Sequence, residues 1–164
     1  MTLLVGIFAT ATFDLMYLAS YLLIGSVVDW SMLGRMAGYL ILKGQFVVFN
    51  WTTVPAIPHE NLIGWCVHYF VGIAYAFFYI YLILFKFKYT NQAWKSIVFL
   101  WCMTVFPFFF LDPLSGSGIF DLKTLHPVYN ILITFCVHTY YGFCLWAWTG
   151  LLKTVAFKNT RPNI

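Results

Sequence analysis

The sequence predicts an all-α integral membrane protein, and three observations support this prediction. Hydrophobic residues make up 62% of the 164-residue chain and charged residues only 9%, whereas about a quarter of a soluble domain is charged. Four apolar runs approach or exceed the ~20 residues that a helix needs to cross a bilayer. The series of short alternating segments that a membrane β-barrel requires does not occur. We therefore expect one helical membrane domain over residues 1–164.

The predicted spans, four in number, cover about residues 3–28, 62–85, 94–111 and 128–152. Aromatic residues such as Trp30, Trp65 and Trp94 lie near their ends, as is typical of membrane interfaces. The net charge of +4 is scattered over loops and the C-terminal tail, which is not the pattern of a nucleic-acid-binding surface. We expect the lipid bilayer as the main partner, other membrane subunits or a second copy of the chain as candidate partners, and no nucleic acid.

The segment 31–49 has two interpretations. It is apolar, but it contains Arg35, Lys43 and three glycines. An amphipathic or re-entrant helix at the membrane interface explains the charges, and we favour this interpretation. A fifth span is the alternative, which an internal repeat in the sequence supports.

That repeat joins two stretches seventy positions apart, Leu62–Gly72 and Leu132–Gly142, which are identical at six of eleven positions. Both contain Cys-Val-His inside a predicted span. The repeat predicts a two-fold relation about the membrane normal, with His68 and His138 at similar depth on helices that run in the same direction. An ionisable residue inside a membrane is costly and is a candidate for function.

Polar residues at helical spacing extend this candidate site to three spans. The site residues that we predict are Asp14, Tyr17, His68, Tyr75, His138 and Tyr141. An aspartate at the centre of a span costs about 2.5–3.5 kcal/mol, so we expect it to face the bundle and to have nearby tyrosine or threonine hydroxyls and one imidazole as partners. A network that only holds the helices together, a proton pathway, and a ligated cofactor such as bis-histidine haem all remain open. The third predicted span has no ionisable interior residue, and we expect it mainly to contact lipid.

No metal site is predicted, because cysteine and histidine two positions apart on a helix point away from each other. Two loops, 50–61 and 112–121, precede the Cys-Val-His spans and therefore emerge on one face of the membrane. We expect a polar mouth there, formed by Arg35, His59, Glu60, Asp112 and Asp121. The opposite face carries six of the nine Lys and Arg residues, which predicts that both termini are cytoplasmic.

Several motifs resemble one protein family. They are Thr10-x-x-x-Asp14, Glu60-x-x-x-Gly64-Trp65-x-x-His68-Tyr69, Pro113-x-x-Gly116 and His138-x-x-x-Gly142. Together they resemble the small bacterial membrane proteins of domain-of-unknown-function family 2938 over nearly the whole chain. The resemblance implies a four-helix protein of the bacterial inner membrane without an assigned activity. It also implies the opposite orientation, because the first and third loops of such relatives are the basic ones.

The leading functional hypothesis is a small carrier or binding subunit that handles protons or a small polar ligand at Asp14, His68 and His138. One alternative is a non-catalytic accessory subunit of a membrane complex, whose polar residues are packing. A second alternative is a haem- or quinone-associated redox protein. Because no catalytic motif occurs, an enzyme is the less favoured class.

Overall fold

The computed structural model describes residues 1–25, 29–45, 54–88 and 90–159, and the regular structure in these ranges is helical. The elements are α1 (Thr2–Ile24), α2 (Ser31–Lys43), α3 (Glu60–Phe78), the π-helix η1 (Tyr79–Lys86), α4 (Ala93–Met103), the π-helix η2 (Pro107–Leu111), α5 (Asp112–Leu114), the 3-10 helix η3 (Ile119–Asp121) and α6 (Pro127–Asn159).

Four helical stretches are long and apolar enough to cross a membrane, which confirms the predicted number. They are Thr2–Leu23, Glu60–Lys86, Ala93–Leu114 and Pro127–Thr154. Helix α2 has 13 residues and is therefore only about 20 Å long, against ~30 Å of hydrocarbon. The described residues thus contain four candidate spans and not five. Residues 46–49, the end of the segment in question, lie outside the described residues.

The first span is shorter than predicted. Helix α1 ends at Ile24 because Gly25 adopts a left-handed conformation with φ of 68°, and its N–H caps the carbonyl of Tyr21. Residues 26–28, which we assigned to this span, lie outside the described residues. The last span is longer than predicted, since α6 continues to Asn159.

The third span is interrupted and also extended. Pro107 has no N–H to donate, and the chain forms a π-helix from Pro107 to Leu111. Helix α5 follows directly, and the turn begins only at Ser115, whose N–H donates to the carbonyl of Leu111. The prediction of a loop from Asp112 was therefore wrong for its first three residues, which form the last turn of the span.

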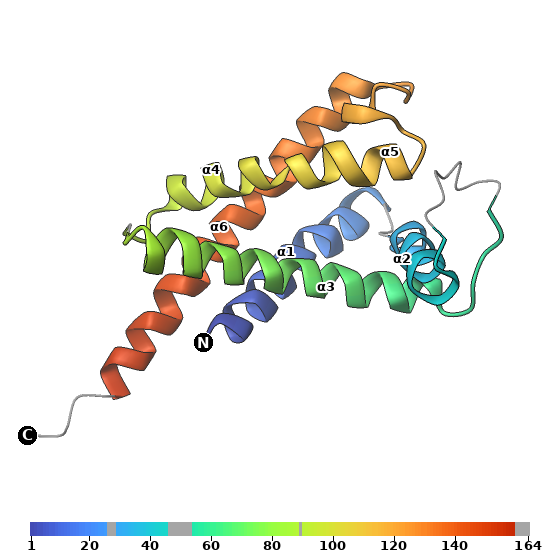
Figure 1. Cartoon of the computed structure of the whole chain (residues 1–164). Coiled ribbons are helices and arrows are strands. Elements are labelled where there is room, and N and C mark those ends of the chain that lie inside the picture. Colours follow the sequence, from blue (N-terminus) through green and yellow to red (C-terminus); the bar gives the residue numbers. More distant parts are fainter. Residues whose placement is uncertain (26–28, 46–53, 89, 160–164) are drawn as a thin grey trace, which may run out of the picture.

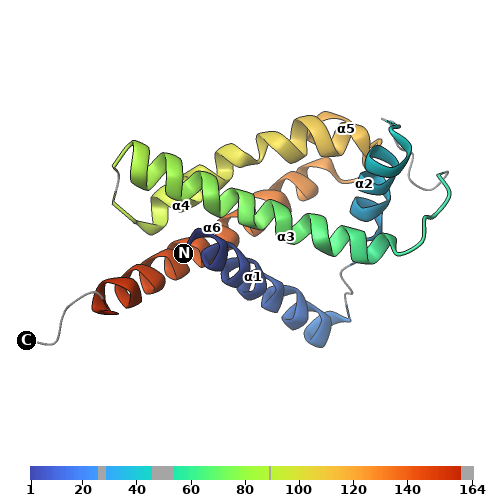
Figure 2. The ribbon, with the colours of Figure 1, turned by 60° about the horizontal axis from the view of Figure 1, so that its bottom comes forward.

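The helices form a bundle in which α1 packs against α3 and α6, α4 packs against α6, and α2 packs against α3. Figures 1 and 2 show α3 and α6 running in one direction and α1 and α4 in the other. The core lies where α1, α3 and α6 meet, and its buried residues include Val5, Ala9, Ala76, Tyr79 and Leu145. The parallel direction of α3 and α6 is the one that the sequence repeat requires, while the two-fold relation itself stays a prediction.

Two glycines bring α2 and the segment before it onto the backbone of α3. A Cβ atom at Gly34 would collide with the carbonyl oxygen of Glu60, and one at Gly64 would collide with the carbonyl oxygen of Trp30. Because these neighbours are backbone atoms, they cannot move aside as a flexible side chain could. The position of α2 therefore depends on the absence of side chains at both glycines.

Candidate functional site

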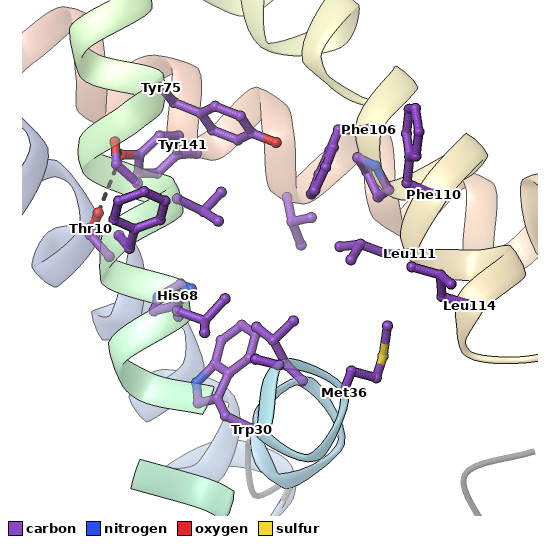
Figure 3. Close-up of a pocket in the computed structure, with 18 of the residues that line it drawn as sticks. Thr10, Trp30, Met36, His68, Tyr75, Phe106, Phe110, Leu111, Leu114 and Tyr141 are labelled. Carbon is purple, nitrogen blue, oxygen red and sulfur yellow. Dashed lines mark hydrogen bonds between the residues drawn. The ribbon is translucent and has the colours of Figure 1, made fainter. Parts of the chain in front are cut away.

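A cavity of about 610 Å³ lies between α2 and α3 on one side and the second half of the third span on the other, with α1 and α6 at its inner end (Figure 3). Its wall is mostly aromatic and aliphatic. Five of the six predicted site residues line it, namely Tyr17, His68, Tyr75, His138 and Tyr141. The structure thus brings together residues that the sequence places on three separate helices.

The sixth predicted residue, Asp14, lies behind this wall and bonds to His68. The distance from His68 Nε2 to Asp14 Oδ1 is 2.9 Å, and the two side chains are only 12% and 15% exposed. Because a carboxylate accepts, Nε2 carries a proton and donates it. The predicted imidazole partner of Asp14 is therefore confirmed. The hydroxyl groups of Tyr17 and Tyr69 also interact electrostatically with this carboxylate.

Aromatic rings enclose the imidazole of His68. The indole of Trp30 stacks on it with ring centroids 4.2 Å apart and an interplanar angle of 23°. Trp65 and Tyr69 approach it edge-on at 5.8 and 5.6 Å. Trp30 was predicted only as an interfacial residue, and its contact with His68 was not predicted. The only signal in the sequence was its position immediately before α2.

His138 is held differently. Its Nδ1 lies 2.8 Å from the carbonyl oxygen of Thr134, one turn earlier in α6. A carbonyl oxygen only accepts, so Nδ1 carries the proton, and Nε2 is a hydrogen-bond acceptor in the neutral ring. The ring of Tyr75 is centred 6.4 Å away, and Figure 3 shows its hydroxyl pointing into the cavity. No hydrogen bond joins that hydroxyl to any part of the chain that the structure describes, so this end of the site has polar atoms to offer a ligand.

Tyr141 closes the inner end of the cavity. Its hydroxyl donates to the carbonyl oxygen of Gly72 at 2.9 Å and lies 3.2 Å from Thr10 Oγ1 (Figure 3). These bonds connect α6 to α3 and α1. Tyr141 is therefore engaged in holding three helices together, whereas Tyr75 is not.

A family model described as "Protein of unknown function (DUF2938)" matches residues 3–152. The chain belongs to the DUF2938 family. This confirms the resemblance noted in the sequence. No curated protein and no solved structure matches the chain. Because the family description names no activity, the function of this DUF2938 chain has to be argued from its own geometry.

Two of the predicted mouth residues form a strong ion pair in this DUF2938 chain. Arg35 donates from Nη2 and Nε to the two carboxylate oxygens of Glu60 at 2.7 and 2.8 Å. Arg35 Nη1 also donates to the carbonyl of Val54, and Glu60 accepts from the N–H of Ile57. The hydrogen bond to Glu60 raises the pKa of Arg35 above its usual value. This bidentate pair fixes α2 to the first turn of α3.

The other predicted mouth residues of the DUF2938 chain are not part of this ion pair. His59 is exposed directly before α3, and Asp112 interacts electrostatically with Asp121 near η3. None of the predicted mouth residues belongs to the wall of the cavity, as far as the described residues define it. The wall includes instead Phe106, Phe110 and other residues from η2 and its flanks. The expectation that the third span mainly contacts lipid was therefore incomplete.

Proposed function

We propose that this protein is a carrier or binding subunit of the bacterial inner membrane that takes a mostly apolar small molecule into the cavity beside His68 and His138. The cavity itself is the observation that carries the proposal. Its volume of about 610 Å³ falls inside the range of about 300–1,000 Å³ that is usual for ligand pockets. Like those pockets, its wall is mostly apolar with a few polar groups.

The cavity argues against the interpretation that the polar residues only hold the bundle together. Protein interiors are close-packed, with few voids larger than a water molecule. A site that served packing alone would leave no polar atom of these residues beside an open space. His138 and Tyr75 both line the cavity, and the hydroxyl of Tyr75 bonds to no described residue.

The wall also favours an apolar ligand over the small polar one that we expected from the sequence. A polar molecule loses its hydrogen bonds to water on entry and recovers few of them from a wall of this composition. An apolar molecule with one polar group can contact the apolar part of the wall with its chain and hydrogen-bond to the few polar side chains with that group. His68 lines the same wall and bonds to Asp14 behind it, so the proton of this hydrogen bond is the one that would couple ligand binding to proton movement.

Native mass spectrometry of the delipidated protein tests the proposal. The probes are three molecules of equal chain length, hexadecane, hexadecanol and hexadecanoate. Val71→Trp fills the cavity wall, and Val98→Trp, on an exposed position of α4 outside the wall, is the matched control. We expect at least one probe to bind to the wild type and to Val98→Trp, with affinity reduced at least tenfold in Val71→Trp.

Equal binding by both tryptophan variants would overturn the proposal, provided that their helix content and melting temperature match. A visible absorption spectrum of the same purified sample tests the alternative of a haem-associated redox protein. A haem band that disappears in His68→Gln and His138→Gln would replace the proposal with that alternative.

A further inference from the structure

We infer that the ligand is a single-chain lipid whose head group is a hydroxyl, and that it enters the cavity sideways from the bilayer and bonds to His138 and Tyr75. This inference rests on the proposed function and adds the route of entry and the chemical class of the ligand. The exposure of the residues that line the cavity supports the route of entry. The hydrogen bonds of His138 and Tyr75 support the chemical class of the ligand.

The outer rim of the cavity faces hydrocarbon. Phe70, Phe106 and Phe110 line the cavity and are also 71%, 43% and 56% exposed. They lie within candidate spans. At the inner end, by contrast, Thr10 and Tyr141 are buried. An opening whose rim is aromatic and lies within membrane-spanning helices admits molecules dissolved in the bilayer and not those dissolved in water.

The opening lies between η2 on one side and α2 and α3 on the other. Figure 3 shows Phe106, Phe110 and Leu111 on one wall, with Trp30 and Met36 across the space from them. In this region the third span is the π-helix that begins at Pro107. Proline and π-helical turns are where helices kink, so the third span departs from a regular helix on this side of the cavity.

The polar end of the ligand is defined by His138. Its Nδ1–H donates to Thr134, and Asp14, the carboxylate that could pair with an imidazolium at this wall, is already bonded to His68. Because an unpaired charge in an apolar wall is costly, the ring is neutral and presents Nε2 as an acceptor. The ligand must therefore supply a hydrogen-bond donor to His138.

The hydroxyl of Tyr75 sets the second requirement, because it can donate to a ligand atom. Tyr75 and His138 both line the cavity, with ring centroids 6.4 Å apart, so we place one ligand oxygen between their polar groups. A hydroxyl group donates and accepts through that single oxygen. An ether or an ester offers no donor, and an ionised carboxylate adds an unpaired charge. The pair of groups therefore selects an alcohol.

His68 is a poorer partner for the head group. Its Nε2 donates to Asp14, and one face of its ring is covered by Trp30. His68 also lines the cavity, but with Nε2 and one ring face already engaged, whereas His138 on α6 keeps Nε2 free of any described partner.

The test compares hexadecanol with hexadecyl methyl ether in the same mass-spectrometric assay. The ether keeps the chain and the accepting oxygen but cannot donate. We expect the wild type to bind the alcohol about tenfold more tightly, because the ether leaves Nε2 of His138 without a partner. His138→Phe should bring this ratio close to one, because only the alcohol donates to Nε2. Tyr75→Phe, which removes no hydrogen bond to any described residue, takes away the donor to an oxygen that both molecules carry, so it should weaken the binding of both several-fold and leave the ratio near its wild-type value. Tyr21→Phe, at an exposed tyrosine outside the cavity, should leave both affinities unchanged.

The possible outcomes separate the two proposals. Equal binding of the alcohol and the ether to the wild type, with both lost in Val71→Trp, would overturn the inference and leave the proposed function standing. Binding that Val71→Trp does not affect would overturn the proposed function itself. If His138→Phe does not fold, the affinity of Tyr75→Phe for the alcohol decides: an affinity equal to that of the wild type overturns the inference.

Discussion

Breaking the bond between Asp14 and His68 should destabilise the protein by an amount that depends on how it is broken. Asp14→Ala leaves the Nε2–H of His68 buried without an acceptor, which costs about 1–3 kcal/mol. Asp14→Asn keeps an oxygen in the same place but removes its charge. Since charge-assisted hydrogen bonds are roughly twice as strong as neutral ones, the asparagine should retain about half of the interaction.

A double-mutant cycle isolates the interaction itself. Hydrogen bonds between membrane helices average about 0.6 kcal/mol and reach about 1.7 kcal/mol. The Asp14–His68 bond is short, at 2.9 Å, and nearly buried, so we expect Asp14→Ala and His68→Ala to show a coupling free energy near the upper value, about 1.5 kcal/mol. His126 is exposed in the loop before α6, and His126→Ala combined with Asp14→Ala should be additive within about 0.3 kcal/mol.

Reversible unfolding in mixed micelles with a denaturing detergent measures all of these free energies. A coupling below about 0.3 kcal/mol would refute the reasoning, because the bond would then contribute nothing to holding α1 on α3. Asp14→Asn also distinguishes stability from function. If Asp14→Asn is more stable than the wild type but no longer binds the probe, the charge of the Asp14 carboxylate serves function at the expense of stability.

Two further predictions concern the packing of α2 on α3 and the orientation of the chain in the membrane. Gly34→Ala should lower the free energy of unfolding by about 1–3 kcal/mol, because its Cβ meets backbone of α3 that cannot yield. Gly150→Ala makes only an ordinary contact at 3.5 Å and should be neutral or stabilising by up to about 1 kcal/mol in the same unfolding assay. If both variants change the free energy of unfolding equally, α2 does not pack on α3 as described. In a background without the native cysteines, Leu125→Cys, at a side chain 93% exposed, should react with an impermeant thiol reagent on intact cells, and Thr90→Cys only after permeabilisation. The reverse pattern would support the orientation implied by the family resemblance.

The sequence alone determined the number of spans and the candidate site residues. Hydrocarbon thickness fixes the length of an apolar run, so four runs predict four spans regardless of how they pack. Helical spacing is equally local, and it placed Asp14, His68 and His138 on polar faces before any contact was known. The cost of burying Asp14 also predicted that it would have an imidazole partner.

Only the tertiary structure decided which imidazole Asp14 bonds and where a ligand could fit. The sequence repeat treats His68 and His138 alike, but α1 packs beside α3 so that Asp14 reaches His68 and leaves His138 to the cavity. The cavity lies between the interrupted third span and helices α2 and α3, whose backbones meet at Gly34. Spacing along a helix fixes only the direction of a side chain, whereas the distance between helices depends on which residues are small enough to let their backbones meet.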